Sequence, residues 1–237
     1  MSRDEATMSL LEHLEELRRR LIIIVAAIVL GSIVGYFLSE PILDILRAPL
    51  PAGYEKLYFT TVGGAFGVRI KIAFFAGIAL AMPVVLFQLW RFVTPGLTRA
   101  ERRLVWPLLL GALALFAIGM TVGYLIIPFA LTFLLSFGEP GRIEPLLTIN
   151  EYVGFVTTLM LAFGLVMEFP IVLIALSRVG ILSYERIARQ RRFVILGIVI
   201  FAVVVTPGGD PFSPSILSAV MYVLFEISLL IIRFLHR

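Results

Sequence analysis

Long apolar stretches separated by short polar segments run through the whole chain. Six of them can be delimited: residues 21–38, 72–90, 104–127, 152–176, 193–205 and 215–232. Four are close to or longer than the roughly 20 residues that a helix needs to cross a hydrocarbon core about 30 Å thick. The pattern predicts an all-α, polytopic integral membrane protein with six transmembrane helices, which form a single membrane domain over residues 1–237.

The third stretch is ambiguous, because apolar residues continue past Pro128 to Phe137. That length is too great for one span, and it hardly leaves room for two spans and a turn. The positions of the arginines distinguish one span from two here, since cytoplasmic loops carry an excess of Lys and Arg. With six spans and both termini in the cytoplasm, about three quarters of the 20 basic residues lie inside. We therefore expect six spans, with residues 129–137 as a separate outer helix after a break at Pro128.

Prolines are expected to shape this bundle. Kinks at proline let transmembrane helices curve instead of packing straight. The prolines in or next to three of the apolar stretches are Pro83, Pro107, Pro128 and Pro170. The sequence thus predicts a curved bundle with a concave face.

The last two spans are expected to be short, the fifth more so than the sixth. Residues 193–205 make about 20 Å of helix, against a hydrocarbon core of roughly 30 Å. Arginines fix the inner end of this helix, so the missing length is expected at the outer end. We expect a polar notch there that carries Thr206 and Asp210 and suits a partner helix. The alternative is that the helix recruits residues 186–192, whose arginine side chains then reach back to the interface.

Composition excludes most enzyme classes. Apolar residues make up 60% of the 237 positions and charged residues 15%, with no cysteine and two histidines. A soluble domain is nearer half apolar and a quarter charged. Disulfides, thiolate metal sites and imidazole-based triads are excluded or very unfavourable, and no hydrolase or nucleotide-binding motif is present. We expect no enzymatic activity, no cofactor and no nucleic-acid partner.

The segment before the first span, residues 1–20, is expected to form a cytoplasmic amphipathic helix. Glu15 with Arg19 and Glu16 with Arg20 are pairs at i,i+4 in the favourable order. Taken alone, they fit an interfacial helix whose charges are merely solvated. The functional interpretation is that the helix presents carboxylates to a cationic partner.

The second inner loop repeats this chemistry. Thr98 and Glu101 have the spacing of a capping box, which alone would explain the glutamate. However, Glu101 also lies among four arginines and close to the aromatic Phe92. These neighbouring arginines and the aromatic side chain favour a role for Glu101 in binding.

Glu168 lies inside the fourth span, next to Phe169 and Pro170. An ionisable group at such a depth is costly and normally faces protein or a wet cavity, so a functional role is favoured. Glu226 in the sixth span follows the same logic, or it only pairs with a neighbouring span. A proton-coupled secondary transporter of a small solute that uses Glu168 is therefore an alternative function. The unequal spans, which show no matched halves, weaken it.

Motifs along the whole chain resemble those of TatC, the twin-arginine translocase subunit family. They occur in the family's order: His13–Arg20, Ala48–Leu50, Phe87–Pro95, Glu101–Arg103, Glu168–Pro170, Thr206–Pro207 and Phe225–Glu226. The resemblance implies a non-enzymatic receptor and translocase core that binds twin-arginine signal peptides of folded cargo proteins. It implies transport driven by the proton-motive force, in the cytoplasmic (inner) membrane of a prokaryote. It further implies an oligomeric complex, embedded in membrane lipids, with single-span TatA/TatB-type subunits.

The same resemblance assigns roles to individual residues. Glu16 and Glu101 match the carboxylates that receive the paired arginines, and Glu168 matches a buried glutamate on the concave face. Residues 206–214 depart from the family pattern by one extra residue, with Pro214 where glutamine is usual. The residues assigned to the signal peptide are Glu16, Arg18, Arg19, Pro49, Phe92 and Glu101. Those assigned inside the membrane are Glu168 and Pro170, and those assigned to partner docking are Thr206, Asp210 and Glu226.

Overall fold

The computed structural model describes residues 10–93, 105–139, 145–178 and 182–235. In this part of the chain every regular element is a helix, apart from one isolated bridge between Tyr58 and Thr148. The helices are α1 (Leu10–Phe37), α2 (Ser39–Arg47), α3 (Gly64–Val93), α5 (Val105–Leu135), α6 (Ile149–Val166), α7 (Phe169–Arg178), α8 (Tyr184–Arg189), α9 (Arg191–Val205) and α10 (Phe212–Leu235).

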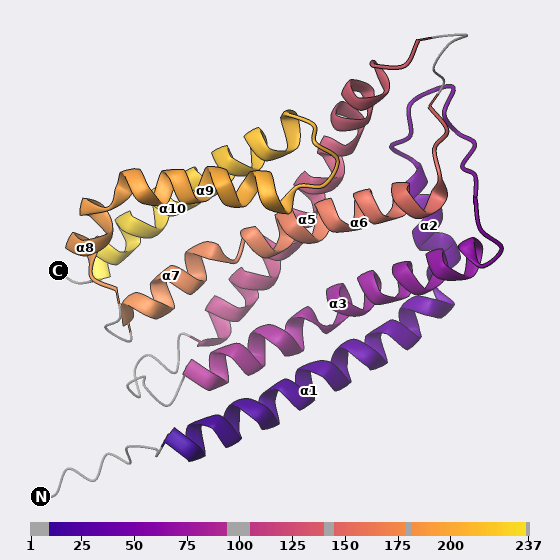
Figure 1. Cartoon of the computed structure of the whole chain (residues 1–237). Helices are drawn as coiled ribbons and strands as arrows, with labels where there is room; N and C mark the ends of the chain where they lie inside the picture. Colours follow the sequence, from indigo (N-terminus) through magenta and orange to yellow (C-terminus); the bar gives the residue numbers. More distant parts are fainter. Residues whose placement is uncertain (1–9, 94–104, 140–144, 179–181, 236–237) are drawn as a thin grey trace, which may run out of the picture.

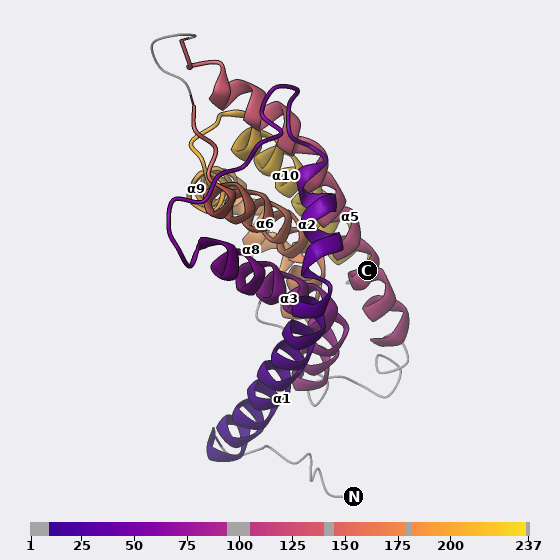
Figure 2. The same ribbon diagram turned by 90° about the vertical axis from the view of Figure 1, so that its right-hand side faces the viewer.

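The long helices lie side by side and alternate in direction (Figure 1). We call the end at which α1 begins and α10 ends the terminal end, and the opposite end, which holds α2, the far end. The main packing partner of α1 is α3, while α6 packs on α5 and α3, and α10 packs on α7 and α9. Figure 2 accordingly shows α1 at one edge of the bundle, with α9 and α10 beyond α6.

Helices long and apolar enough to cross a membrane cover five of the six predicted stretches. They are Leu14–Phe37, Gly64–Phe92, Trp106–Leu135, Ile149–Ser177 and Phe212–Phe234. The remaining stretch is α9, which has only 15 residues and ends at Val205. The expectation of a short sixth span is wrong, because α10 has 24 residues. Pro214 lies in its first turn, where a missing N–H costs no helix hydrogen bond, so the helix starts earlier than the apolar pattern suggests.

The predicted break at Pro128 is also wrong. α5 continues through this proline for 31 residues, so residues 129–135 belong to the same helix. Ile126, Ile127, Ala130 and Leu131 are buried on both sides of Pro128. Packing of this kind holds the two halves of the helix in line, although the proline removes one backbone hydrogen bond. The fourth predicted span, by contrast, consists of α6 and α7.

The described part of the N-terminal segment is not a separate interfacial helix. α1 runs without interruption from Leu10 to Phe37, so the charged residues form the first turns of the first long helix. Leu, Glu and Arg are all good helix formers, and the segment contains no glycine or proline before Gly31. This continuity fixes the direction in which the charged residues project.

Small residues bring α1 and α3 together. A Cβ atom at Gly31 would lie 2.8 Å from the carbonyl oxygen of Gly77, and one at Gly77 would lie 2.1 Å from the Oγ of Ser32. Glycine at these positions lets two membrane helices approach closely. The contact sets the register that places the first turns of α1 beside the last turns of α3.

Candidate functional sites

A charged cluster links α1 and α3 at the terminal end. Arg20 forms an ion pair with Glu16, as the i,i+4 spacing predicts. The Nη1 of Arg20 also donates a hydrogen bond to the Oε1 of Gln88 on α3, at 3.2 Å. Arg20 is only 9% exposed, so this guanidinium is enclosed by the protein. Gln88 thereby orients Arg20, and Arg20 orients the carboxylate of Glu16.

The other oxygen of Glu16, Oε2, is buried and has no hydrogen-bond partner among the described residues. Glu16 is also one of the residues that line a hollow of about 850 Å³, together with Glu15, Arg18, Arg19, Ile22 and Ile23. A buried carboxylate oxygen without a partner is unfavourable, which makes it a ready acceptor for an incoming cationic group.

The structure brings together only some of the predicted signal-peptide residues. Arg18 and Arg19 are exposed on α1 beside the hollow, and Phe92 lies half-buried one turn after Gln88 on α3. Glu101 lies outside the described residues. Pro49 follows α2 at the far end, about 30 Å along α1 from Glu16. A single cluster that contains both Pro49 and Glu16 is therefore not formed in this chain.

Glu168 occupies the turn that separates α6 from α7. Its side chain is 7% exposed, and neither carboxylate oxygen has a hydrogen-bond partner among the described residues. Its backbone carbonyl accepts hydrogen bonds from the amides of Ile171 and Val172, at 3.0 and 3.1 Å. Pro170, which is buried, lies in the first turn of α7, where it displaces no helix hydrogen bond. The carboxylate thus faces the protein interior, and not the exposed surface.

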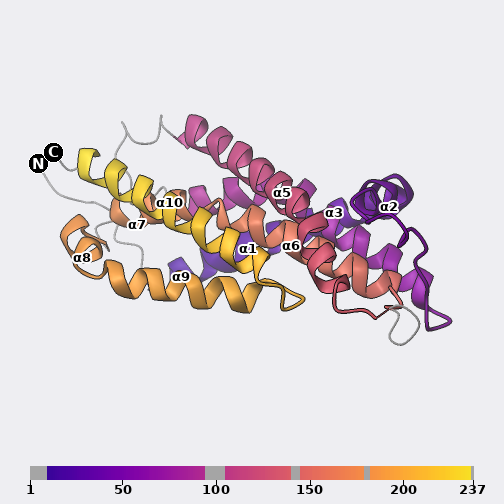
Figure 3. The same cartoon turned by 90° about the horizontal axis from the view of Figure 1, so that it is seen from above.

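Thr206 and Asp210 hold the turn between α9 and α10, which Figure 3 shows from above. The Thr206 hydroxyl donates to the carbonyl of Ala202 at 2.8 Å, and the Asp210 Oδ1 accepts from the amide of Ser213 at 2.7 Å. Gly208 and Gly209 have φ angles of +97° and +72°. Two glycines in the left-handed region accommodate the residue by which this turn exceeds the family pattern.

Sequence reasoning missed Ser213, although its position three residues after Asp210 is the spacing of a helix N-cap. Ser213 is fully buried, and its Oγ and the Oδ2 of Asp210 have no hydrogen-bond partner among the described residues. The turn therefore contains a small polar centre, but Asp210 itself is only 3% exposed.

Glu226 forms an ion pair with Arg191, with Nη2 and Oε2 3.2 Å apart. Pairing with a neighbouring helix was one of its two predicted roles. Because α9 and α10 are antiparallel, this pair sets Val205 level with Phe212, and α10 runs nine residues beyond Glu226 to Leu235. Relative to α10, the missing length of α9 therefore lies at the terminal end, whereas its position relative to the membrane stays a prediction. Relative to α6 the turn is deep, since Gly208 packs on Phe155, about 9 Å along that helix.

Buried carboxylates and a guanidinium within a bundle of long apolar helices define a multi-pass membrane protein with polar groups inside the bundle. A profile described as "TatC: Sec-independent protein translocase protein (TatC)" matches residues 12–219. The chain therefore belongs to the TatC family of protein translocase subunits. These are not enzymes, and membership excludes the alternative of a small-solute transporter.

Similar proteins support this assignment over nearly the whole chain. A TatC protein of Carboxydothermus hydrogenoformans is 38% identical, over 98% of this chain and 96% of its own length. A chloroplastic TATC protein of Pisum sativum is 36% identical, over 91% of this chain and 61% of its own length. A crystal structure of the twin arginine translocase receptor TatC superposes with a TM-score of 0.81 and 34% identity, over 95% of this chain and 100% of that one.

Proposed function

We propose that this protein is the receptor for twin-arginine signal peptides and the core of the translocation site for folded cargo. The unpartnered Oε2 of Glu16, one of the residues that line the hollow at the terminal end, is the observation that carries the proposal. An arginine side chain presents a planar fork that can bond a carboxylate at two points, which a lysine cannot do. Arg20 and Gln88 hold the Glu16 carboxylate in place for this contact, and Glu101 supplies a second acceptor.

The proposal includes an orientation. The terminal end would face the cytoplasm, in the inner membrane of a prokaryote, so that both chain ends lie on that side. α9 would be the fifth of six spans, with about 22 Å of helix in a locally thinned bilayer. The proton-motive force would drive transport.

Partner subunits would dock on α9. This helix lies at an edge of the bundle with α10 as its main neighbour, and Val203 and Val204 on it are 58% and 77% exposed. A single-span TatA/TatB-type helix could cover this apolar face within an oligomeric complex. Thr206 and Asp210 are buried, so their role would be to shape the turn beside the docking surface, with Glu226 fixing the register.

The direct test is binding of a signal peptide with paired arginines to the purified protein. Glu16→Gln removes the acceptor charge and is expected to weaken binding roughly tenfold, since a charge-assisted hydrogen bond contributes about 1.5–3 kcal/mol. Glu15→Gln is the matched control, because Glu15 lines the same hollow but is not paired with Arg20. A Lys-Lys version of the peptide should bind weakly to all variants. Equal binding by Glu16→Gln and the unmodified protein would contradict the proposal.

A further inference from the structure

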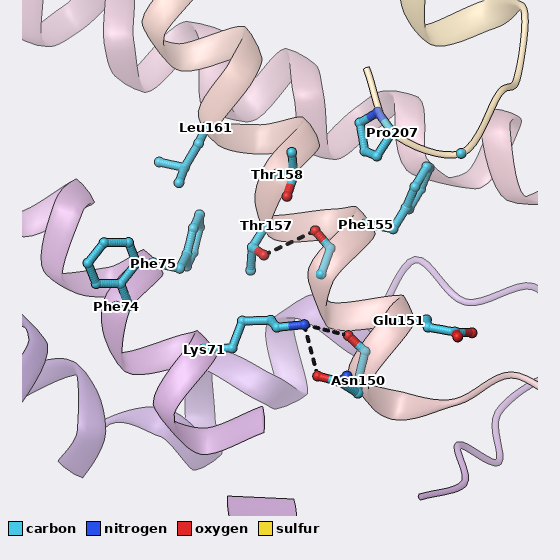
Figure 4. A pocket seen from close by; sticks show the side chains of 12 residues that line it. Lys71, Phe74, Phe75, Asn150, Glu151, Phe155, Thr157, Thr158, Leu161 and Pro207 are labelled. Atoms are coloured by element: carbon cyan, nitrogen blue, oxygen red, sulfur yellow. Dashed lines mark hydrogen bonds between the residues drawn. The ribbon is translucent and has the colours of Figure 1, made fainter. Parts of the chain in front are cut away.

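A second pocket lies in the far half of the bundle, away from the Glu16 hollow. It has a volume of about 600 Å³ and lies between α3, α6 and the turn at Pro207 and Gly208 (Figure 4). No role was predicted for its residues, and the receptor function proposed above does not use them. Its charged and amide side chains lie at one end, and phenylalanines, a leucine, two threonines and the turn line the rest.

A lysine forms the polar rim. The Nζ of Lys71 donates to the backbone oxygen of Asn150 at 2.9 Å and to its Oδ1 at 2.8 Å. Both acceptors are neutral, and within the described ranges no carboxylate lies within ion-pair distance of this ammonium group. Glu151 is exposed and points away from Lys71 in Figure 4. The ammonium group has a third donor, so it can still bind an anion.

The backbone of α6 leaves space for this ammonium group. A Cβ atom at Gly154 would lie 3.0 Å from the Nζ of Lys71. The Lys71 side chain therefore reaches from α3 to α6 and ends against this glycine, at the polar end of the pocket.

The apolar part of the pocket has the depth of one leaflet. Eleven residues of α6 separate Asn150 at the rim from Leu161 at the other end of the pocket, which is about 16 Å of helix. Half of a typical hydrocarbon core is about 15 Å. Phe74 and Phe75 on α3 line this depth, and Phe74 is 56% exposed, so the pocket opens sideways toward lipid.

The pocket is also large enough for one acyl chain, since its volume of about 600 Å³ extends over about 16 Å of helix. We propose that this pocket binds one phospholipid with an anionic headgroup, whose phosphate is bound by Lys71 and whose acyl chain lies against Phe74, Phe75 and Leu161.

Native mass spectrometry of the detergent-purified protein with added phosphatidylglycerol tests the headgroup contact. Lys71→Gln is expected to weaken retention roughly fivefold, since one lysine near an anionic lipid surface contributes about 1 kcal/mol. Lys71→Arg should retain the lipid. Lys56→Gln is the matched control, because Lys56 is an exposed basic residue that does not line the pocket. Equal retention by the Lys71→Gln variant and the unmodified protein, or an equal loss in Lys56→Gln, overturns the proposal.

The acyl-chain contact needs its own test. Thr158→Trp fills the apolar part of the pocket without changing its charge, and it should also lose phosphatidylglycerol. Glycerol 3-phosphate, which has the headgroup chemistry but no chains, should not be retained at the same concentration. A photo-reactive side chain at position 158 should crosslink to lipid in membranes. Retention of glycerol 3-phosphate, or crosslinking of position 158 to a protein helix, would contradict a lipid site.

Discussion

At the scale of single residues, polar groups inside this protein fall into two kinds. Arg20 and Glu16 form an ion pair, and Gln88 on another helix accepts a hydrogen bond from Arg20, although the Oε2 of Glu16 and the Nε of Arg20 have no partner among the described residues. Glu168 has no such partner among the described residues. A buried polar group without a hydrogen bond costs free energy, so a chain that keeps one gives up stability at that position.

This contrast leads to a prediction for Glu168. Glu168→Leu replaces an unpaired carboxylate with an apolar side chain of similar size, and it should raise the free energy of unfolding by about 1–3 kcal/mol. The same variant should export cargo poorly while binding signal peptide normally, because the site at Glu16 is untouched. Thermal unfolding in detergent, peptide binding and export in membranes measure the three properties.

Met167→Leu is the control for this experiment, since Met167 is equally buried, at 7% exposure, and the exchange conserves volume. It should export normally. A Glu168→Leu variant that exports as well as Met167→Leu, or that is less stable, would show that the buried carboxylate has only a structural role.

Sequence spacing could predict the Glu16–Arg20 pair, because residues four apart share one face of a helix. It could not predict Gln88, which lies 68 residues away from Arg20. That contact depends on the register between α1 and α3. The register is set by Gly31, Gly35 and Gly77. The close approach that these glycines allow is seen only once the two helices are packed together.

At the scale of helices, this glycine contact should decide the geometry of the charged cluster. A Cβ atom at Gly77 would lie 2.7 Å from the backbone nitrogen of Ser32, so Gly77→Ala forces α1 away from α3. We expect a loss of about 1–3 kcal/mol of unfolding free energy, typical of overpacking, together with weaker peptide binding. Urea unfolding in mild detergent and peptide titration would measure both effects.

Gly111→Ala serves as the comparison, because a Cβ atom at this position on α5 meets nothing within 4 Å. Alanine is the better helix former, so this variant should be neutral or slightly stabilised. If Gly77→Ala behaves like Gly111→Ala, the close approach of α1 and α3 does not matter for the cluster.

The apolar pattern predicted where the helices lie better than where they end. It located the five spans that are long and apolar enough to cross a membrane, but it split α5 at Pro128 and shortened α10. Both errors have the same cause, since proline costs little in a first turn or in a helix held on both sides by packing. The break at Met167 and Glu168 is the reverse case, where the chain does leave the helix just before Pro170.

At the scale of the whole molecule, α9 and α10 form a hairpin that is held at two points. Arg191 pairs with Glu226 toward the terminal end, and the turn at Gly208 packs on Phe155 of α6. Arg233 lies over the ring of Tyr184, at 5.9 Å, and so ties α8 to the end of α10. The length of α9 between these points determines the depth of its turn and the position of its exposed face.

Four leucines inserted after Val205 would lengthen α9 by about 6 Å and push the turn outward past Phe155. The monomer should still fold, because α9 lies at an edge of the bundle and has α10 as its main neighbour. Association with single-span partners and export should both be lost, since the displaced turn no longer presents the same surface. As a control, four Gly and Ser residues after Gly53, where a Cβ atom would meet nothing within 4 Å, should leave export intact. Crosslinking from position 204 to the partner helix and export in membranes would measure the outcome. Normal crosslinking and export by the lengthened variant would mean that the short α9 has no part in docking.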